Sequence, residues 1–137
     1  MFALNVRDHI MIAHSFKGEV FGPAQKLHGA TFVIDLELHR NDLDPNGIVA
    51  DIGALSGLLH EVLAPLNYQN LDELEAFRGR NTTTEVLACE IAERVRARIL
   101  DGALGEDAKQ ALDGLKVTLS ESHIAWASYQ TSLVRTG

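Results

Sequence analysis

A stretch of alternating side chains, residues 27–38, constrains this fold more than any other feature of the sequence. Its large apolar members share one parity: Phe32, Ile34, Leu36 and Leu38. A period of two is typical of a strand with one face against a core and the other face wetter. His28 and Ala30 have the parity of the apolar residues, so they continue the buried side. His28 is therefore either a packed core histidine or a metal ligand.

The composition indicates a single domain over residues 1–137. This length suffices for one core, and 46% hydrophobic residues is typical of a globular protein. A formal charge of −7 without a Lys/Arg cluster argues against a nucleic-acid surface. No apolar run approaches the ~20 residues of a membrane span. Because there is one cysteine, Cys89, and no signal-peptide layout, we expect no disulfide and a cytoplasmic location.

Residue periodicity predicts the element order β-β-α-α-β-β. Glycine and proline residues indicate loops between the strands, and Asp51 is a good N-cap for the first helix, which ends near Pro65. Thr82 and Glu85 have the spacing of a capping box at the start of the second helix. The pattern breaks between Gly102 and Gly114. The expected strands are residues 2–16, 30–40, 115–120 and 124–133.

Helices grouped between two pairs of strands indicate an α+β domain, with an antiparallel four-stranded sheet and both helices on one face. Such a sheet has two open edges, which invite pairing with other copies of the chain. Val33 and Ala127 fall on the outer parity, which suggests that the outer face is not fully wetted. Both features favour subunits that join their sheets into a barrel. A monomer with solvated sheet edges is the alternative.

Glu121 stands out at the end of the third predicted strand. It shares the parity of Leu115, Val117 and Leu119, so strict alternation directs its carboxylate toward the apolar side. Burial of an unpaired carboxylate is costly, and charge-assisted hydrogen bonds offset that cost. A flat heterocycle with adjacent ring N–H and amine donors, such as a pterin or guanine, offers two of them. Alternatively, Glu121 has left the strand and is solvated or caps nearby amides.

Six stretches in order give the whole chain a resemblance to one family. They are Ile12-Ala13-His14-Ser15-Phe16, Leu27-His28-Gly29, Asn46-Gly47-Ile48-Val49-Ala50-Asp51, Leu66-Asn67-Tyr68-Gln69-Asn70-Leu71-Asp72, Asn81-Thr82-Thr83-Thr84-Glu85 and Val117-Thr118-Leu119-Ser120-Glu121-Ser122. The sequence resembles the 6-pyruvoyl-tetrahydropterin synthase and 6-carboxytetrahydropterin synthase family, which has the tunnelling fold. The resemblance implies a hexamer, two trimeric rings stacked into a barrel, with pterin sites between subunits.

Members of that family bind zinc through three histidines, and the resemblance retains two of the positions. His14 and His28 occupy them, but the third position, in the family's His-Gly-His motif, is Ala30. A catalytic zinc normally has three protein ligands and a water, and alanine has no lone pair to offer. We therefore expect no cofactor, with His14 and His28 as remnants of a metal site. Zinc held with the help of His9 or a nearby carboxylate is the alternative.

The groups that carry the family's chemistry are substituted as well. The loop 18–27 lacks the family's cysteine, and Glu19 does not match the spacing of the glutamate that some relatives use instead. The family's Asp-His relay corresponds to Asn67 and Tyr68. Asn67 cannot ionise, and the reference pKa of tyrosine, about 10, is too high for proton transfer at neutral pH. The resemblance therefore assigns no catalytic residue here.

The ring-binding end of the family's site is retained. The resemblance places Glu121 at the edge of the pterin and the hydroxyls of Thr83 and Thr84 near its ring. Helix capping is the other interpretation of the threonines. Tyr68 or Trp126 is a candidate aromatic wall, although Trp126 also suits a packed strand position.

These features predict a divergent homologue that binds a pterin-like or deazapurine-like molecule through Glu121 and lacks zinc-dependent synthase activity, or performs an undemanding step such as tautomerisation or aldol cleavage. One alternative is an active 6-pyruvoyl- or 6-carboxytetrahydropterin synthase with substituted catalytic groups. Another is a structural subunit of mixed tunnelling-fold rings. The expected partners are the small molecule and copies of this chain in a hexamer, without nucleic acid or membrane.

Overall fold

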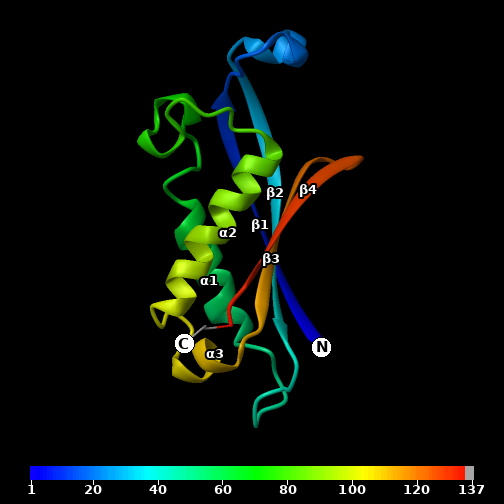
Figure 1. The fold of residues 1–137 in the computed structure, drawn as a ribbon, viewed down its shortest axis with the longest axis vertical. Coiled ribbons are helices and arrows are strands. Elements are labelled where there is room, and N and C mark those ends of the chain that lie inside the picture. Colours follow the sequence, from blue (N-terminus) through cyan, green and yellow to red (C-terminus); the bar gives the residue numbers. More distant parts are fainter. Residues whose placement is uncertain (135–137) are drawn as a thin grey trace.

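A computed structural model describes residues 1–134 as a four-stranded antiparallel sheet with helices on one face (Figure 1). The strand order in the sheet is β1-β2-β3-β4. The strands are β1 (Phe2–His14), β2 (His28–Arg40), β3 (Gly114–Ser122) and β4 (Ala125–Ser132). The predicted α+β class and element order are confirmed, although β1 ends two residues before, and β2 begins two residues before, the predicted limits.

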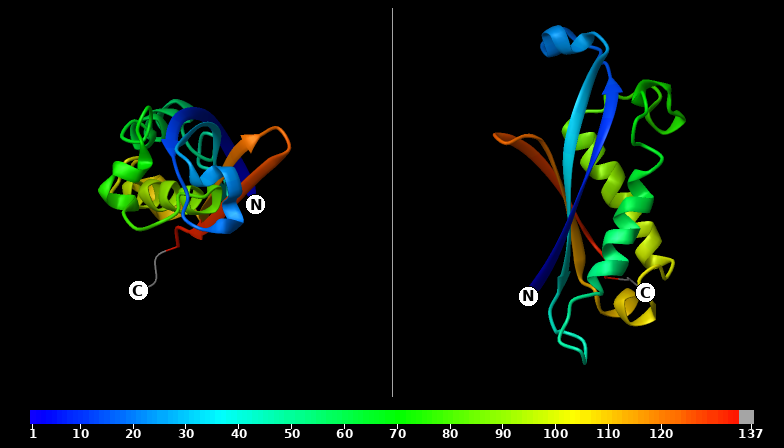
Figure 2. Two further views of the ribbon diagram at one scale, coloured as in Figure 1. Left: turned by 90° about the horizontal axis from the view of Figure 1, so that it is seen from above. Right: turned by 180° about the vertical axis from the view of Figure 1, so that it is seen from behind.

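The two predicted helices, α1 (Ile52–Leu63) and α2 (Thr84–Leu100), lie on the same face of the sheet (Figure 2). Asp51 caps α1 as predicted, because its carboxylate accepts a hydrogen bond from the Ala54 N–H at 3.0 Å. A further short helix, α3 (Glu106–Ala111), occupies the segment where only a break was predicted. Short 3-10 helices also form: η1 (Glu19–Gln25), which is kinked at Gly22, η2 (Leu71–Glu73) and η3 (Glu75–Phe77).

The core lies between the sheet and the helices. The alternating residues of β2 point into it, and Ile34, Leu36 and Leu38 have no exposed surface. The predicted inward stripe of α2 is fully buried: Leu87, Ala88, Ile91, Ala92, Val95 and Ile99. Burial of these side chains provides the main driving force for docking the helices on the sheet. No helix among residues 1–134 has the length and apolar character to cross a membrane.

The outer face of the sheet differs from the expectation in one respect. Ala127 pairs with Leu119, whose side chain is in the core, so Ala127 faces the helices and not the outer surface. Trp126 takes the outer parity instead and is 64% exposed. The β3–β4 hairpin that carries it bends away from the body of the molecule (Figure 1).

The edge of the sheet at β1 is open over only part of its length. The segment between α1 and η2 runs beside the end of β1, where the Tyr68 N–H donates to the Met11 carbonyl at 2.7 Å. The Ala13 N–H donates to the Gln69 carbonyl at 3.0 Å. The connector thus covers the β1 edge near residues 11–13, which corrects the expectation of two fully open edges.

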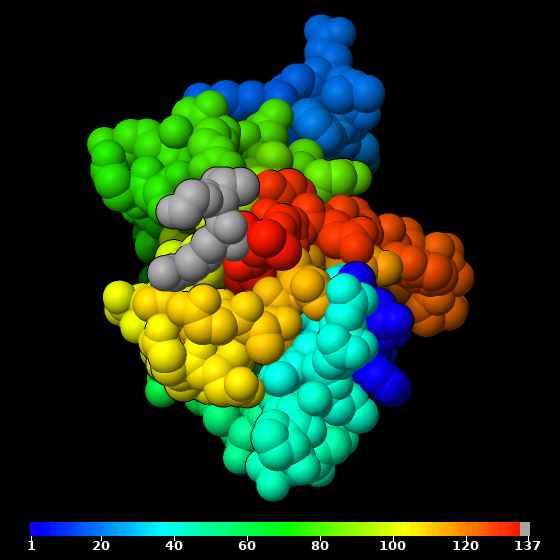
Figure 3. Space-filling model, turned by 60° about the horizontal axis from the view of Figure 1, so that its bottom comes forward, coloured from blue at the N-terminus to red at the C-terminus, as the bar shows by residue number. Residues whose placement is uncertain are grey.

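Arg40 joins the far end of β2 to the α3 region. Its side chain is 7% exposed and donates to the carbonyls of Asp42 and Val49 and to the carboxylate of Asp107. Figure 3 shows the β2–α1 loop (cyan) and α3 (gold) side by side at this end. Because Asp107 is 69% exposed, its ion pair is screened by water and the two carbonyl contacts carry most of the benefit.

Replacement of Arg40 by methionine should lower the free energy of unfolding by about 1–3 kcal/mol, because the buried Val49 carbonyl and the partly buried Asp42 carbonyl lose their donor. The change Asp107→Asn, which removes only the exposed ionic partner, should cost less than ~1 kcal/mol. Urea denaturation of both variants measures the difference. Equal costs for the two variants would contradict this assignment.

Candidate functional site

The register of β1 and β2 brings His14 and His28 together. They are direct cross-strand partners, and their ring centroids lie 4.6 Å apart in an edge-on arrangement. Both side chains lie on the helix-facing side of the sheet, as their parity predicts. Ala30 pairs with Ile12 on the same side, one step farther along the hairpin.

His14 is held rigidly. Its side chain is buried, and its Nδ1 lies 2.9 Å from the hydroxyl oxygen of Thr82. Removal from water and, next, the neighbouring His28 lower the pKa of His14 below its ordinary value, against weaker opposing effects of Asp72 and Glu121. His14 is consequently a neutral imidazole at neutral pH.

His28 is also bonded through Nδ1. Its Nδ1 lies 2.8 Å from the Lys26 carbonyl oxygen, which can only accept, so Nδ1 carries the proton. In both histidines, Nε2 is therefore the nitrogen left for a ligand or a metal. This arrangement would suit two imidazole ligands of one metal ion.

A third protein ligand for a metal is missing from the site. No group of three or more His, Cys, Asp or Glu residues within residues 1–134 is arranged to hold a metal ion. His9, the alternative named from the sequence, is 74% exposed beside Asp8, and its odd-numbered position faces away from His14. His14 and His28 offer two nitrogen donors, and the third position holds only the methyl group of Ala30. This set does not fit a catalytic zinc with three protein ligands.

The start of α2 supplies the hydroxyls of the site. Thr83, not Thr82, caps the helix: its hydroxyl accepts from the Val86 N–H at 3.2 Å. The predicted capping box of Thr82 and Glu85 is therefore wrong by one residue. The shift frees Thr82, which is 1% exposed, to contact His14.

Glu121 lies at a β-bulge. Ser120 pairs with Trp126 and Ser122 pairs with Ala125, so Glu121 is the extra residue of β3. Its carboxylate reaches the helix side as the parity predicts, where it accepts a hydrogen bond from the Thr84 hydroxyl at 3.3 Å. The prediction that the carboxylate is buried is wrong for the single chain, since Glu121 is exposed.

A cavity of about 570 Å³ connects these groups. It brings together six residues singled out from the sequence: His14, His28, Ala30, Thr83, Thr84 and Glu121. Sequence reasoning missed the aromatic part of its lining, Phe16, Phe21 and Phe32. Phe16 and Phe32 share the parity of the histidines, and that signal was sufficient to find them, whereas Phe21 belongs to η1 and has no such signal.

Asn67 and Tyr68 do not line this cavity. The Asn67 side-chain oxygen accepts a hydrogen bond from the Met11 N–H at 3.0 Å. Asn67 thus belongs to the connector that covers the edge of β1. Tyr68 is 77% exposed and has a positive φ of 61°, which suits a tight reversal of the chain. Neither Tyr68 nor Trp126 forms an aromatic wall of the cavity in the single chain.

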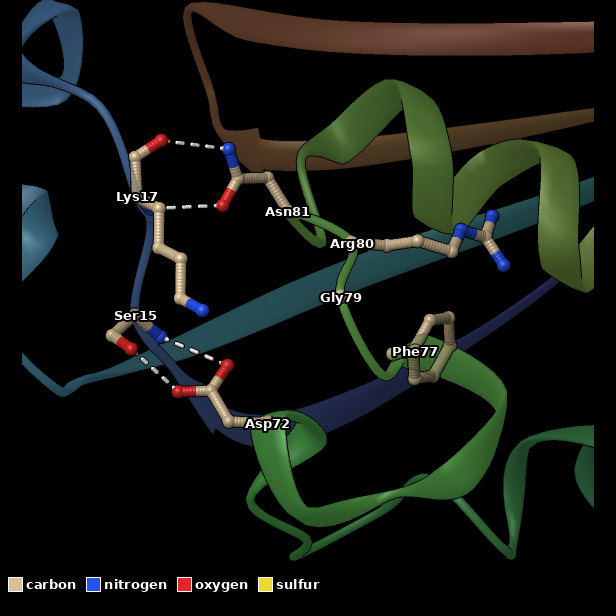
Figure 4. Close-up of a pocket in the computed structure, with 7 residues that line it drawn as sticks. All are labelled: Ser15, Lys17, Asp72, Phe77, Gly79, Arg80 and Asn81. Atoms are coloured by element: carbon tan, nitrogen blue, oxygen red, sulfur yellow. Dashed lines mark hydrogen bonds between the residues drawn. The ribbon is translucent and has the colours of Figure 1, made fainter.

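Behind His14, two hydrogen-bonded pairs fasten the segment after β1 to the segment before α2 (Figure 4). The Ser15 hydroxyl donates to the Asp72 carboxylate at 2.6 Å. The Asn81 side chain bonds both the N–H and the carbonyl of Lys17, each at 2.9 Å. These contacts fix the distance between His14 and the threonines at the start of α2.

Comparison with known proteins shows which family the chain belongs to. The model of the family described as 6-pyruvoyl tetrahydropterin synthase matches residues 3–132. The 6-carboxy-5,6,7,8-tetrahydropterin synthase of Bacillus subtilis (strain 168) is 31% identical over 102 residues. That match covers 70% of this chain and 66% of the relative, just under two thirds of its length.

Solved structures show the same fold. The 6-pyruvoyl tetrahydropterin synthase of Caenorhabditis elegans superposes with a TM-score of 0.79 at 24% identity, over 96% of each chain. That of Plasmodium vivax gives a TM-score of 0.76 at 18% identity, over 96% of this chain and 98% of its own. The chain thus has the tunnelling fold, as the resemblance implied.

The contact between Asn67 and Met11 predicts that position 67 acts on stability. Asn67→Ala removes the acceptor and should cost about 0.5–1.5 kcal/mol of unfolding free energy. Asn67→Asp keeps an acceptor oxygen and should cost less. Amide hydrogen exchange gives a local measurement: the Met11 N–H should exchange faster in Asn67→Ala than in Asn67→Asp, and identical rates would contradict the assignment.

Proposed function

Since the chain belongs to the 6-pyruvoyl tetrahydropterin synthase family, we propose that its cavity binds a pterin-like or deazapurine-like heterocycle without the zinc-dependent synthase reaction. The observation that carries this proposal is the pairing of a retained ring-binding end with an incomplete metal site. Glu121 and Thr84 lie in contact at one end, while Ala30 stands beside two imidazoles at the other.

Glu121 is suited to hold the heterocycle. A carboxylate accepts several hydrogen bonds, and the Thr84 hydroxyl occupies only one site on Oε2. A ring N–H and an adjacent exocyclic amine can therefore donate to the two oxygens side by side, as in other bidentate pairs. The Thr84 hydroxyl also orients the carboxylate across the cavity. The contact between Glu121 and Thr84 therefore supports heterocycle binding, independently of how many metal ligands the chain provides.

The reaction chemistry of the family lacks support from these residues. Among residues 1–134, no cysteine lines the cavity, and neither Asn67 nor Tyr68 contributes to the lining. The geometry of the two histidines supports hydrogen bonding to a ligand through Nε2 rather than Lewis-acid catalysis. Any step performed here would rest on Glu121 as the proton acceptor, with pocket hydroxyls in support.

We also propose that the chain assembles into a hexamer of two trimeric rings. β4 is an edge strand, and β1 leaves residues 2–10 beyond the connector's cover, so backbone donors and acceptors remain for pairing between copies. Glu121 is exposed in the single chain, and a neighbouring subunit would enclose it. Enclosure would strengthen its hydrogen bonds to a ligand.

Isothermal titration with neopterin and with guanine tests the proposed binding. Glu121→Gln should weaken binding by about 30-fold or more, because charge-assisted hydrogen bonds are worth ~1.5–3 kcal/mol each. Glu85→Gln, which changes the other carboxylate of the cavity lining, should change affinity by less than about threefold. The assigned role of Glu121 would be refuted if the protein bound neither neopterin nor guanine. It would also be refuted if Glu121→Gln and Glu85→Gln lost the same affinity.

Ala30→His tests the metal assignment. This change supplies the third imidazole and should give about one tightly bound zinc per chain by elemental analysis, with at least about a hundred-fold gain in affinity. Ala30→Leu, a control of similar bulk without a donor atom, should gain none. Stoichiometric zinc in the unmodified protein would instead favour an active synthase whose third ligand comes from another group.

A further inference from the structure

A hollow of about 270 Å³ lies beside the segment that follows β1, outside the cavity of the proposed function (Figure 4). The two share no lining residue: Phe16 lines the cavity, whereas its neighbours Ser15 and Lys17 line the hollow. The other wall of the hollow comes from residues 72–81 of the same chain. The hollow is therefore built within one chain, at the opposite end of β1 from residues 2–10, which the proposed assembly uses.

Asp72 supplies a carboxylate to the hollow. Its Oδ2 accepts from the Ser15 hydroxyl at 2.6 Å, and its Oδ1 accepts from the Ser15 N–H at 3.3 Å. The Asp72 N–H donates in turn to the side chain of Asn70, the N-cap of η2, at 3.0 Å. The carboxylate is thus held in one orientation, and each of its oxygens keeps a lone pair for a further donor.

Lys17 supplies an ammonium group to the same hollow. The Asn81 side chain holds the Lys17 backbone on both sides, since it accepts from the N–H and donates to the carbonyl, each at 2.9 Å. Figure 4 shows the Lys17 side chain directed toward Ser15 and Asp72. Because Asp72 bonds Ser15, Lys17 and Asp72 line the hollow as separate charges of opposite sign.

Arg80, the other cation of the lining, interacts with its own segment and with α2. Its Nη1 donates to the Ala76 carbonyl at 3.1 Å and lies 3.8 Å from the Glu90 carboxylate. Its guanidinium carbon lies over the buried Phe77 ring, 5.8 Å from the ring centroid. Arg80 and Phe77 therefore form a fixed wall, and Lys17 is the cation that the hollow offers to a ligand.

We infer that this hollow binds a small zwitterion of the α-amino acid type, with its ammonium group at Asp72 and its carboxylate at Lys17. Such a ligand carries its two opposite charges on one carbon atom, and each charge gains a charge-assisted hydrogen bond. A simple anion would meet Asp72, and a simple cation would meet Lys17, as a like charge.

The size of the hollow agrees with this class of ligand. Pockets for drug-sized molecules have volumes of about 300–1,000 Å³, so a hollow just below that range suits a single amino acid. The side chain of the ligand would lie toward the Phe77 wall. The inference adds a second ligand site to the chain and does not depend on the proposed heterocycle.

Saturation-transfer NMR on the full chain, in the assembly that it forms, compares L-valine with two compounds that each lack one of its charges, isobutylamine and isovalerate. L-Valine should bind at least about ten-fold more tightly than either, because each of them loses one charge-assisted contact. Added salt should weaken L-valine binding. Equal binding of the three compounds, or no binding of L-valine, would overturn the inference.

Three variants test the assigned contacts. Lys17→Gln should weaken L-valine binding by at least about ten-fold. Asp72→Asn should do the same, although its side-chain oxygen still accepts from Ser15. Lys26→Gln removes an exposed lysine that does not line the hollow and should change the affinity by less than about threefold. Equal losses in Lys17→Gln and Lys26→Gln would contradict the role of Lys17.

Neopterin separates this inference from the proposed function. Because the cavity and the hollow share no lining residue, saturating neopterin should leave the affinity for L-valine unchanged. Competition between the two compounds would place L-valine in the cavity and overturn the inference. Binding of L-valine without binding of neopterin or guanine would support the inference and refute the proposed function alone.

Discussion

The register of the β1–β2 hairpin is the constraint on which the rest of the structure depends. Thirteen consecutive residues of each strand pair, from Phe2 with Arg40 to His14 with His28. Because successive side chains alternate between faces, a slip of one residue would turn His28 and Ala30 away from the helices together with Ile34 and Leu36. The energy of the buried core thus also sets the geometry of the site, and the imidazole pair cannot shift without unpacking the sheet.

The site has two ends that differ in chemical content. Thr82 contacts His14, and the Lys26 carbonyl contacts His28, in each case through Nδ1. Nε2 is therefore the ring nitrogen left for a ligand in the cavity that both histidines line. The methyl group of Ala30 and the phenylalanine rings surround that end. At the other end, a bulge in β3 sets Glu121 opposite Thr84. The proposed binding of a flat ring and the proposed absence of a catalytic zinc each rest on a different one of these two ends.

Periodicity predicted most of the fold because burial follows parity. It gave the sheet, both long helices and the shared face of His14, His28 and Ala30. It could not predict the bulge at Glu121, because the extra residue that a bulge places in one strand does not change the alternation of side chains in the sequence. Among three consecutive threonines, the spacing to Glu85 favoured Thr82 as the cap of α2. In the structure Thr83 is the cap, and Thr82 makes a buried contact with His14 that the sequence does not indicate. The contact of Asn67 with the edge of β1 joins it to Met11, 56 residues away in the sequence, so no local pattern could predict it.

The central claim is that the protein binds the heterocycle through Glu121 and does not bind a catalytic zinc at His14 and His28. A crystal structure of the protein soaked with neopterin, with diffraction data collected on both sides of the zinc absorption edge, tests both parts in one measurement. We predict a pterin edge within hydrogen-bond distance of both Glu121 oxygens and no anomalous peak between His14 and His28. A zinc peak at the two imidazoles, or a pterin bound away from Glu121, would contradict the account.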